Sequence, residues 1–320
     1  MRCPDIDSSE VMAVKRYLAA AGWALGMLVL ILDGRTAMAG AADGVEMCIK
    51  TLVPSLFPFF LLSAMLTGSL SGGSLLLTGI LGGYPIGAAN AARSCKAGQL
   101  TKAEAERQAV LCNCAGPSFL FGVVTPVLAE LWMGFALWGI YLTSVLVLWA
   151  IFPKCTQVPG VRRHVTVQQS MVDSVRAMAG ICGWVVFFRV WTAVLDRWVL
   201  WLLPDWGQAV VYGLLELSGG CLSLARIEPQ LRPVLAAGFI GFGGLCVMLQ
   251  TAGVADGLSL RLYFPGKLFQ GTVCMLLASF LTPGTVSPAV QAILGTCAVL
   301  LGHFLRKSEN RCGNRKPVRV

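Results

Sequence analysis

Hydrophobic residues along this chain fall into long runs separated by short polar segments, and these runs set the expected architecture. The runs cover residues 17–32, 51–69, 74–92, 110–129, 131–152, 177–195, 207–225, 233–254, 262–282 and 287–305. Several of them approach the roughly 20 residues that a helix needs to cross a bilayer. The pattern therefore predicts an all-α polytopic membrane protein.

Two of the ten runs are interrupted at their middle by residues that end helices. The run 74–92 contains the tetrapeptide GGYP at 82–85, and the run 207–225 contains ELSGG at 216–220. Because Gly and Pro end helices, each run is expected to form two half-helices that enter the membrane and turn back. Such irregular backbone is tolerated at membrane depth only where protein or a wet cavity shields it.

The loop charges favour eight crossings and two re-entrant hairpins, because Lys and Arg accumulate in short cytoplasmic loops. In this topology 19 of the 25 basic residues lie inside, 5 lie outside, and Arg189 lies within a span. Ten full crossings would instead move the basic residues of 93–109 and 153–176 outside. The inside segments are 1–16, 93–109, 153–176, 255–267 and 306–320, and the outside segments are 33–50, 196–206 and 226–232.

The predicted topology divides the chain into two halves that contain the same parts in opposite orientation. Such inverted-topology repeats are typical of secondary transporters, in which broken helices meet at the substrate site. The expected units are an N-terminal transmembrane helix (1–43), repeat 1 with its hairpin (44–153), a cytoplasmic linker (154–176), inverted repeat 2 with its hairpin (177–282), and a C-terminal transmembrane helix with a basic tail (283–320).

The first apolar run also has features of a signal peptide. Lys15 and Arg16 precede it, and Ala37-Met38-Ala39 resembles a signal-peptidase site. Cleavage of this segment is left open. The remaining topology is the same in either case, because both place Gly40 outside.

Composition excludes several other classes of function. The net charge of +9 comes from loops and tails beside apolar runs, where topology and anionic lipid explain it, so no nucleic-acid partner is expected. The twelve Cys, without paired CxxC motifs and with only two His, are expected to be small buried residues rather than a metal site or a disulfide framework. No P-loop, GxSxG or HExxH motif is present, so we expect no enzyme and no cofactor beyond a coupling ion, H⁺ or Na⁺.

Polar helix breaks are the first candidates for ligand contact. The first half carries GYPIG at 83–87 and NCAGPS at 113–118. Unwinding there would free amide and carbonyl groups, and half-helix N-termini suit an anionic ligand. Alternatively, Gly and Pro merely kink these helices for packing. Between the breaks, Thr101 and Glu104 have the spacing of a capping box and predict a short cytoplasmic helix.

Charged residues inside the apolar runs are the second group of candidates. A carboxylate within the membrane costs roughly 2.5–3.5 kcal/mol, so Glu216 is a candidate proton carrier, cation ligand or acceptor for substrate. The alternative is a salt bridge to Arg189. That arginine would otherwise meet a substrate carboxylate or extend toward interfacial tryptophans. Gln250 and Asn113 would bind a polar ring or amide, or else join helices to one another.

Several of these segments together resemble a known family. They are GVEMCIKTLVPSLFPFFLLSAML (44–66), the stretch from GGYPIGAANAARS to NCAGPSFLFGVV (82–124), GLLELSGG (213–220), FGGLCVMLQ (242–250) and LYFPGKLFQ (262–270). Over about 44–282 the chain resembles the sporulation integral membrane proteins of the YlbJ type, in the wider nucleoside-recognition or Gate-domain group.

The resemblance implies a fold similar to that of concentrative nucleoside transporters, with paired re-entrant hairpins, in a bacterial inner membrane, either plasma or forespore. It also implies a link to endospore formation and to the passage of dipicolinic acid. One departure is ELSGG at 216–220, where a polar amide is expected in place of Gly219, and this puts an identical substrate in doubt. The residues expected to line the central site are Tyr84, Pro85, Gly87, Asn113, Gly116, Pro117, Ser118, Glu216, Ser218, Gly243, Gly244 and Gln250.

The sequence thus predicts a secondary transporter or permease for a small polar metabolite, anionic or heteroaromatic, like dipicolinate or a nucleoside. Its expected partners are this small-molecule substrate and the lipid bilayer, and assembly into a homo-oligomer is left open. The alternative is a non-transporting membrane scaffold or assembly factor of the Gate-domain group. That alternative predicts a dry, packed midplane with Glu216 paired to Arg189.

Overall fold

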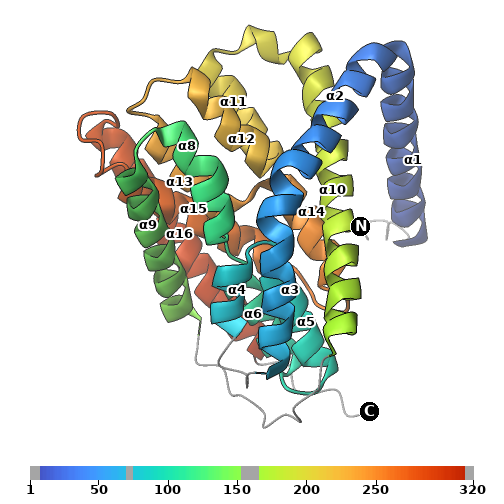
Figure 1. The fold of residues 1–320 in the computed structure, drawn as a ribbon, viewed down its shortest axis with the longest axis vertical. Helices are drawn as coiled ribbons and strands as arrows, with labels where there is room; N and C mark the ends of the chain where they lie inside the picture. The colour runs from blue at the N-terminus through green and yellow to red at the C-terminus, as the bar shows by residue number, and fades with distance from the viewer. Residues whose placement is uncertain (1–7, 70–74, 153–165, 314–320) are drawn as a thin grey trace, which may run out of the picture.

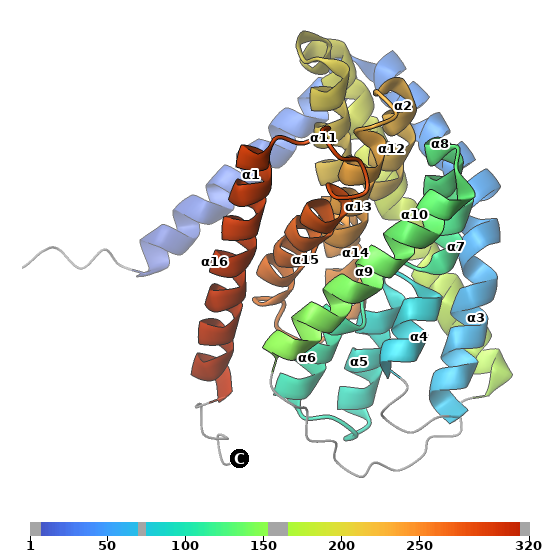
Figure 2. The ribbon, with the colours of Figure 1, turned by 90° about the vertical axis from the view of Figure 1, so that its left-hand side faces the viewer.

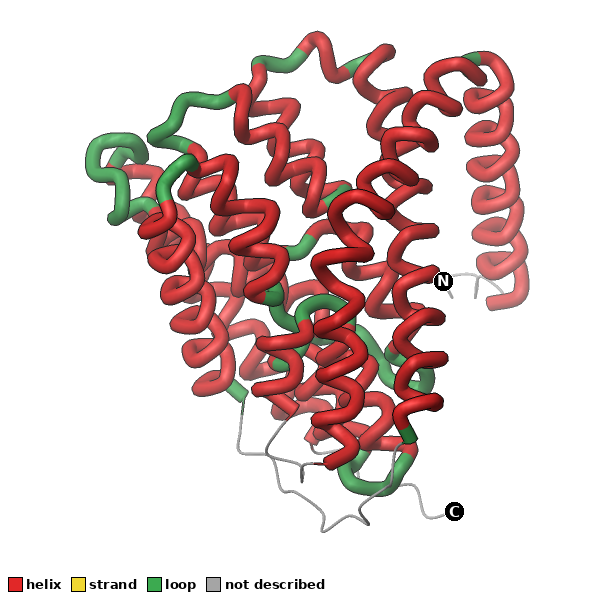
Figure 3. The backbone as a smooth tube through the Cα atoms, viewed as in Figure 1, coloured by secondary structure: helices red, strands yellow, loops and turns green. Residues whose placement is uncertain are grey.

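The computed structural model describes residues 8–69, 75–152 and 166–313, and all regular elements in these ranges are helices (Figures 1 and 3). Within these ranges, five helical segments are long and apolar enough to cross a membrane: Gly34–Leu62, Leu131–Ile151, Val167–Trp198, Arg232–Val254 and Pro288–Ser308. Arg16–Leu32 and Pro117–Leu128 are shorter apolar helices. The predicted all-α class is confirmed, with several helices long and apolar enough to cross a membrane.

The first half of the chain forms a peripheral helix, a long helix, a helical hairpin and an interrupted helix. The hairpin consists of α4 and α5, which contact each other on either side of the break at 83–85. The elements are α1 (Ser8–Leu32), α2 (Gly34–Met47), the π-helix Cys48–Leu52, α3 (Val53–Ser69), α4 (Leu75–Gly82), α5 (Ile86–Lys96), α6 (Lys102–Leu111), α7 (Pro117–Phe119), the π-helix Leu120–Val124, α8 (Thr125–Leu128) and α9 (Leu131–Ile151).

The second half contains a second hairpin and a second interrupted helix. The helices α11 and α12 contact each other on either side of Glu216, and Gly243 separates α13 from α14. The elements are α10 (Val167–Trp198), the 3-10 helix Leu200–Leu202, α11 (Asp205–Leu215), α12 (Leu217–Ser223), the 3-10 helix Leu224–Arg226, α13 (Arg232–Phe242), α14 (Gly244–Val254), α15 (Tyr263–Ala278) and α16 (Pro288–Gly313).

The two hairpins lie toward opposite ends of the bundle. The pair α4–α5 lies in the lower part of Figure 1, and α11–α12 lies in the upper part (Figures 1 and 2). The α5–α6 connection and the C-terminal end of α16 share the lower end, whereas α8 and α9 are joined at the upper end. Helical hairpins therefore occur where the sequence predicts them, and their position relative to a membrane stays a prediction.

The segment 33–50, which the loop charges place outside the membrane, is largely helical. There α2 and the following π-helix continue into α3 and pack along α10. Small residues permit this contact: a Cβ on Gly40 would lie 2.8 Å from the Ala193 Cβ, and one on Gly44 would lie 2.8 Å from the Val186 Cα. Charge counting did not detect this helix, because its basis is close packing.

The predicted capping box at the start of α6 is also confirmed. The Thr101 Oγ1 accepts the Glu104 amide at 3.3 Å, and the Glu104 Oε2 accepts the Thr101 amide at 2.9 Å, which completes the predicted capping box. Nine cysteines have described side chains, and six of these are buried.

The first hairpin is held against the break that follows α6 by backbone contact. A Cβ on either Gly79 or Gly87 would overlap the carbonyl oxygen of Cys112. At the tip, Gly83 has a positive φ of 80° and lies against Gly116, whose amide nitrogen is 3.1 Å from where a Gly83 Cβ would be. The absence of side chains at these positions therefore brings both polar breaks of the first half together.

Substitution of Gly79 by Ala tests this contact. The added methyl group would push the Cys112 backbone away, and we expect a loss of about 1–3 kcal/mol in the free energy of unfolding. Gly139→Ala in α9 is the matched control, because a Cβ there meets nothing within 4 Å. Thermal unfolding of purified protein in detergent measures both, and equal melting temperatures would contradict the proposed contact.

Candidate functional site

The tip of the first hairpin reaches the break in the second half of the chain. The Tyr84 hydroxyl donates a hydrogen bond to the Ile240 carbonyl at 2.8 Å and lies 3.3 Å from the Tyr141 hydroxyl. A Cβ on Gly243 would lie 3.5 Å from the Tyr84 Cζ. Tyr84 therefore joins α4–α5 to the point where α13 ends.

The break between α6 and α7 also bonds to other helices. The Ala115 amide donates to the Tyr141 hydroxyl at 2.9 Å. Asn113, which is fully buried, donates through its Nδ2 to the Thr251 Oγ1 at 2.8 Å and to the Tyr263 hydroxyl at 2.5 Å. Asn113 thus links the first half to α14 and α15, which matches the interhelical role that the sequence left open.

Lys267 is a central residue that the sequence reasoning missed. It lies in the second turn of α15, and its side chain is fully buried. Its Nζ donates to the Asn113 carbonyl at 2.5 Å and to the Gln270 Oε1 at 2.8 Å. The nitrogen also lies 5.4 Å and 5.8 Å from the ring centroids of Tyr84 and Tyr263.

Lys267, which the charge count placed in the segment 255–267, thus lies in a buried helix and not in a loop, and Arg189 is not the only basic residue well inside the bundle. The count of loop charges included Lys267 because this residue lies at the edge of an apolar run. At such an edge the sequence does not distinguish the end of a loop from the first turns of a helix. The spacing of Tyr263, Lys267 and Gln270 was an available signal. Residues three and four apart share one face of a helix, and this face is polar within an apolar segment.

Glu216 has a local structural role at the second hairpin. Its Oε1 accepts the Ser218 amide at 2.8 Å and its Oε2 accepts the Gly219 amide at 2.6 Å, so it is the N-cap of α12. The Arg189 Nε lies 4.0 Å from the same Oε2. The sequence alternative in which these two residues approach each other is therefore realised, at the limit of an ion pair.

Arg189 also contacts α2 from its position on α10. Its Nη1 lies 3.2 Å from the Asp43 Oδ2, and its Nη2 donates to the Met47 sulfur at 3.3 Å. A Cβ on Gly219 would lie 3.1 Å from the Glu216 Oε2 and 3.4 Å from the Arg189 Cζ. A larger residue at 219 would crowd this pair, which gives a structural reason for the glycine in ELSGG.

The remaining predicted residues occupy several environments. Gln250 donates to the Cys246 sulfur at 3.1 Å within α14, and Pro117 begins α7. Ser118 is partly buried, and Ser218 is buried. The Ser118 Oγ has no hydrogen-bond partner among the described residues. A Cβ on Gly244 would lie 3.1 Å from the Gly213 carbonyl oxygen, so the second break packs on the second hairpin.

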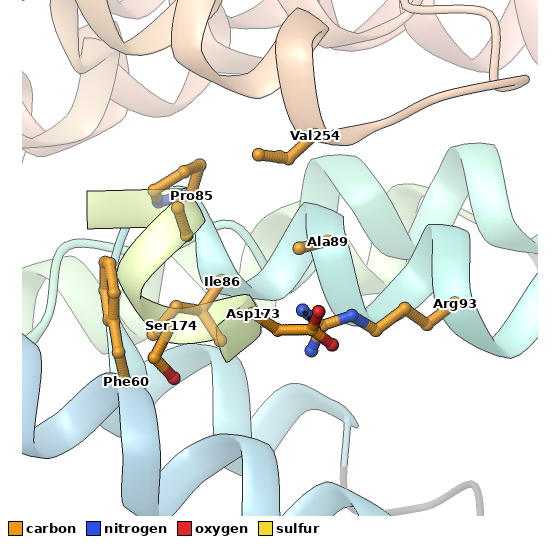
Figure 4. Close-up of a pocket in the computed structure, with 9 residues that line it drawn as sticks. Phe60, Pro85, Ile86, Ala89, Arg93, Asp173, Ser174 and Val254 are labelled. Atoms are coloured by element: carbon orange, nitrogen blue, oxygen red, sulfur yellow. Dashed lines mark ion pairs between the residues drawn. The ribbon is translucent and has the colours of Figure 1, made fainter. Parts of the chain in front are cut away.

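A pocket lies beside α5 of the first hairpin (Figure 4). Arg93 and Asp173 point toward each other across it and form an ion pair at 3.5 Å. Among the predicted site residues, Pro85 lines it; the full lining is Phe60, Pro85, Ile86, Ala89, Arg93, Asp173, Ser174, Ala177 and Val254. Nearby, the Lys96 ammonium, 2.8 Å from Asp256, holds the pKa of that carboxyl below its usual value.

Comparison with known proteins supports the resemblance noted in the sequence. The chain is 23% identical over 305 residues to the sporulation integral membrane protein YlbJ of Bacillus subtilis (strain 168), covering 71% of this chain and 73% of the relative. The chain is similar to YlbJ. No family model matches it, and no solved structure matches it.

The similarity to YlbJ and the apolar helices together identify an integral membrane protein. The aligned share of each chain is large enough that the likeness is not restricted to one motif. Tyr84, Asn113 and Lys267 come from both halves of the chain, and only the folded structure brings them together.

Replacing the capping carboxylate tests the role of Glu216. Glu216→Ala removes the acceptor of two backbone amides, and we expect a loss of about 1–2 kcal/mol in the free energy of unfolding. Glu228→Ala is the control, because Glu228 is exposed and its side chain forms no described bond. If both variants unfolded at the wild-type temperature in detergent, the capping role would be wrong.

Proposed function

We propose that this protein is a secondary transporter or permease for a small polar metabolite, anionic or heteroaromatic, in a bacterial inner membrane. The observation that carries the proposal is the meeting of helix breaks from the two halves. Tyr84 at the first hairpin contacts Ile240 and Gly243 at the break between α13 and α14. In transporters built from inverted repeats, substrate sites lie where interrupted helices meet.

The helix interruptions supply the hydrogen-bonding groups of this proposed site. Residues 113–116 lie between α6 and α7 and are not helical, so their backbone groups bond to side chains, as the Asn113 carbonyl and the Ala115 amide do. We propose that such groups also bond to the ligand. The surrounding polar side chains, Asn113, Thr251 and Tyr263, are buried and could exchange one partner for another. A gradient of H⁺, of Na⁺ or of the substrate itself would drive movement.

The similarity to YlbJ, which is named a sporulation integral membrane protein, supports a role in sporulation. Dipicolinate-like and nucleoside-like compounds are the substrate classes to test first. The repeat architecture and the re-entrant position of α4–α5 and α11–α12 belong to the same proposal. The proposal also places the lower end of the bundle in Figure 1, together with the C-terminus, on the cytoplasmic side.

A membrane scaffold or assembly factor is the second candidate. It is favoured by the contact of Glu216 with Arg189 and by the burial of the residues at the breaks. In that case the polar contacts would serve only to hold the helices together. Transport measurements separate the two functions.

Single cysteines at exposed positions test the topology. Asp205 and Glu228 lie on either side of α11–α12, and a re-entrant hairpin returns both to the outer face. We expect Asp205→Cys and Glu228→Cys to react with a membrane-impermeant maleimide on intact cells, above the level of the parent protein. Lys102→Cys and Arg261→Cys should react only after permeabilisation.

Reaction of Asp205→Cys and Glu228→Cys from opposite faces would refute the re-entrant hairpin. The parent protein corrects for native thiols, because Cys297 is exposed in the structure. Fluorescence of a C-terminal fusion reports independently on the side that carries the C-terminus.

Uptake into reconstituted vesicles tests the transport function. We expect accumulation of dipicolinate or of nucleosides above the level in protein-free vesicles. Tyr84→Phe removes the hydroxyl that joins the first hairpin to Ile240, and a lost hydrogen bond of about 1 kcal/mol predicts a roughly fivefold slower rate. Tyr17→Phe is the matched control, because Tyr17 is exposed on α1. Folded wild-type protein that moves none of these compounds would favour the scaffold.

A further inference from the structure

Lys267 is a buried cation without an acidic partner. Among the side chains that the structure describes, no carboxylate oxygen lies within 4.0 Å of its Nζ. A buried ammonium is costly unless it is paired with an opposite charge and hydrogen-bonded. Arg189, by contrast, has Asp43 and Glu216 beside it. The protein thus balances one internal cation with its own acids and leaves the other unbalanced.

The hydrogen bonds of Lys267 use two of its three donors. They go to the Asn113 carbonyl and to the Gln270 Oε1, both of which are neutral. The rings of Tyr84 and Tyr263 lie beside the ammonium at 5.4 Å and 5.8 Å, a distance at which an aromatic face attracts a cation. These contacts hold the ammonium in place and leave its charge available.

A second observation at the same place also points to a ligand. Asn113 is fully buried, and its Oδ1 has no hydrogen-bond partner among the described residues, although its Nδ2 donates twice. Buried acceptors are normally satisfied. The carbonyl of this same residue accepts from Lys267, so the unpaired acceptor and the unbalanced cation are adjacent.

We infer that Lys267 and Asn113 bind a small organic carboxylate that also carries an N–H or O–H donor. The ammonium of Lys267 pairs with the carboxylate, and the Asn113 Oδ1 accepts the hydrogen of the donor. The inference rests on the proposed transport function for its biological meaning and narrows the substrate class of that site. It makes Lys267 the residue that selects anions.

Three planar probes of nearly equal shape separate the two contacts. Pyrrole-2-carboxylate has both the charge and the N–H donor, furan-2-carboxylate lacks the donor, and pyrrole-2-carboxamide lacks the charge. A ligand that binds only the folded state raises the melting temperature. We expect pyrrole-2-carboxylate to stabilise purified wild-type protein most, and both other probes to bind at least about tenfold more weakly.

Variants of Lys267 test the assignment of the charge. Lys267→Met removes the charge at similar volume, and Lys267→Gln keeps a hydrogen-bonding group without it. Both should weaken binding of pyrrole-2-carboxylate by about 10- to 100-fold and abolish the preference for it over pyrrole-2-carboxamide. Lys102→Met, at an exposed position at the start of α6, should leave binding unchanged.

The ligand-free stability of the variants supplies an independent readout. It shows whether each variant is folded before binding is compared, because removal of the ammonium also leaves the buried Asn113 carbonyl and the Gln270 Oε1 without this donor. The inference is overturned if the wild type binds neither carboxylate, or if Lys267→Met and Lys267→Gln retain the wild-type affinity and preference.

Uptake of labelled pyrrole-2-carboxylate separates this inference from the proposed function. Binding that depends on Lys267 without uptake by the wild type would retain the anion site and reject transport. Uptake at the same rate by wild type and Lys267→Gln would retain transport and reject the site.

Discussion

The need to satisfy backbone groups where helices are interrupted inside an apolar bundle governs this structure. Such groups are tolerated away from water only when other parts of the protein bond to them. The Tyr84 hydroxyl bonds to the Ile240 carbonyl, and the Lys267 ammonium bonds to the Asn113 carbonyl. In both cases the side chain and the carbonyl come from different halves of the chain. Satisfying the breaks therefore also joins the halves.

Small residues make these bonds geometrically possible. Gly79 and Gly87 let the first hairpin lie directly on the backbone at Cys112, and Gly244 lies against the backbone of the second hairpin. Each hairpin thus packs against the interrupted helix of its own half. This correspondence supports the inverted-repeat interpretation, because the same contact is made twice by unrelated residues. It also explains why polar groups from distant segments meet at one place.

The two internal cations differ in how their charge is balanced. Arg189 lies between Asp43 and Glu216, and Glu216 in turn caps α12. A structural role therefore accounts for this cluster. Lys267 has only neutral acceptors and aromatic rings around it in the described ranges. Glu216, a candidate site residue from the sequence, thus has a structural explanation in this cluster, whereas Lys267 has no such explanation. The site is better centred on Lys267.

The sequence by itself determined the apolar runs, the positions of both hairpins, the break at 113–118, and the cap formed by Thr101 and Glu104. These features depend on local composition, since Gly, Pro and capping residues act within a few positions of themselves. Only the tertiary structure decided that 33–50 continues a helix along α10 and that Lys267 is buried beside Asn113. Residues more than 100 positions apart create those environments, and no local pattern records which distant backbone will lie against a given side chain.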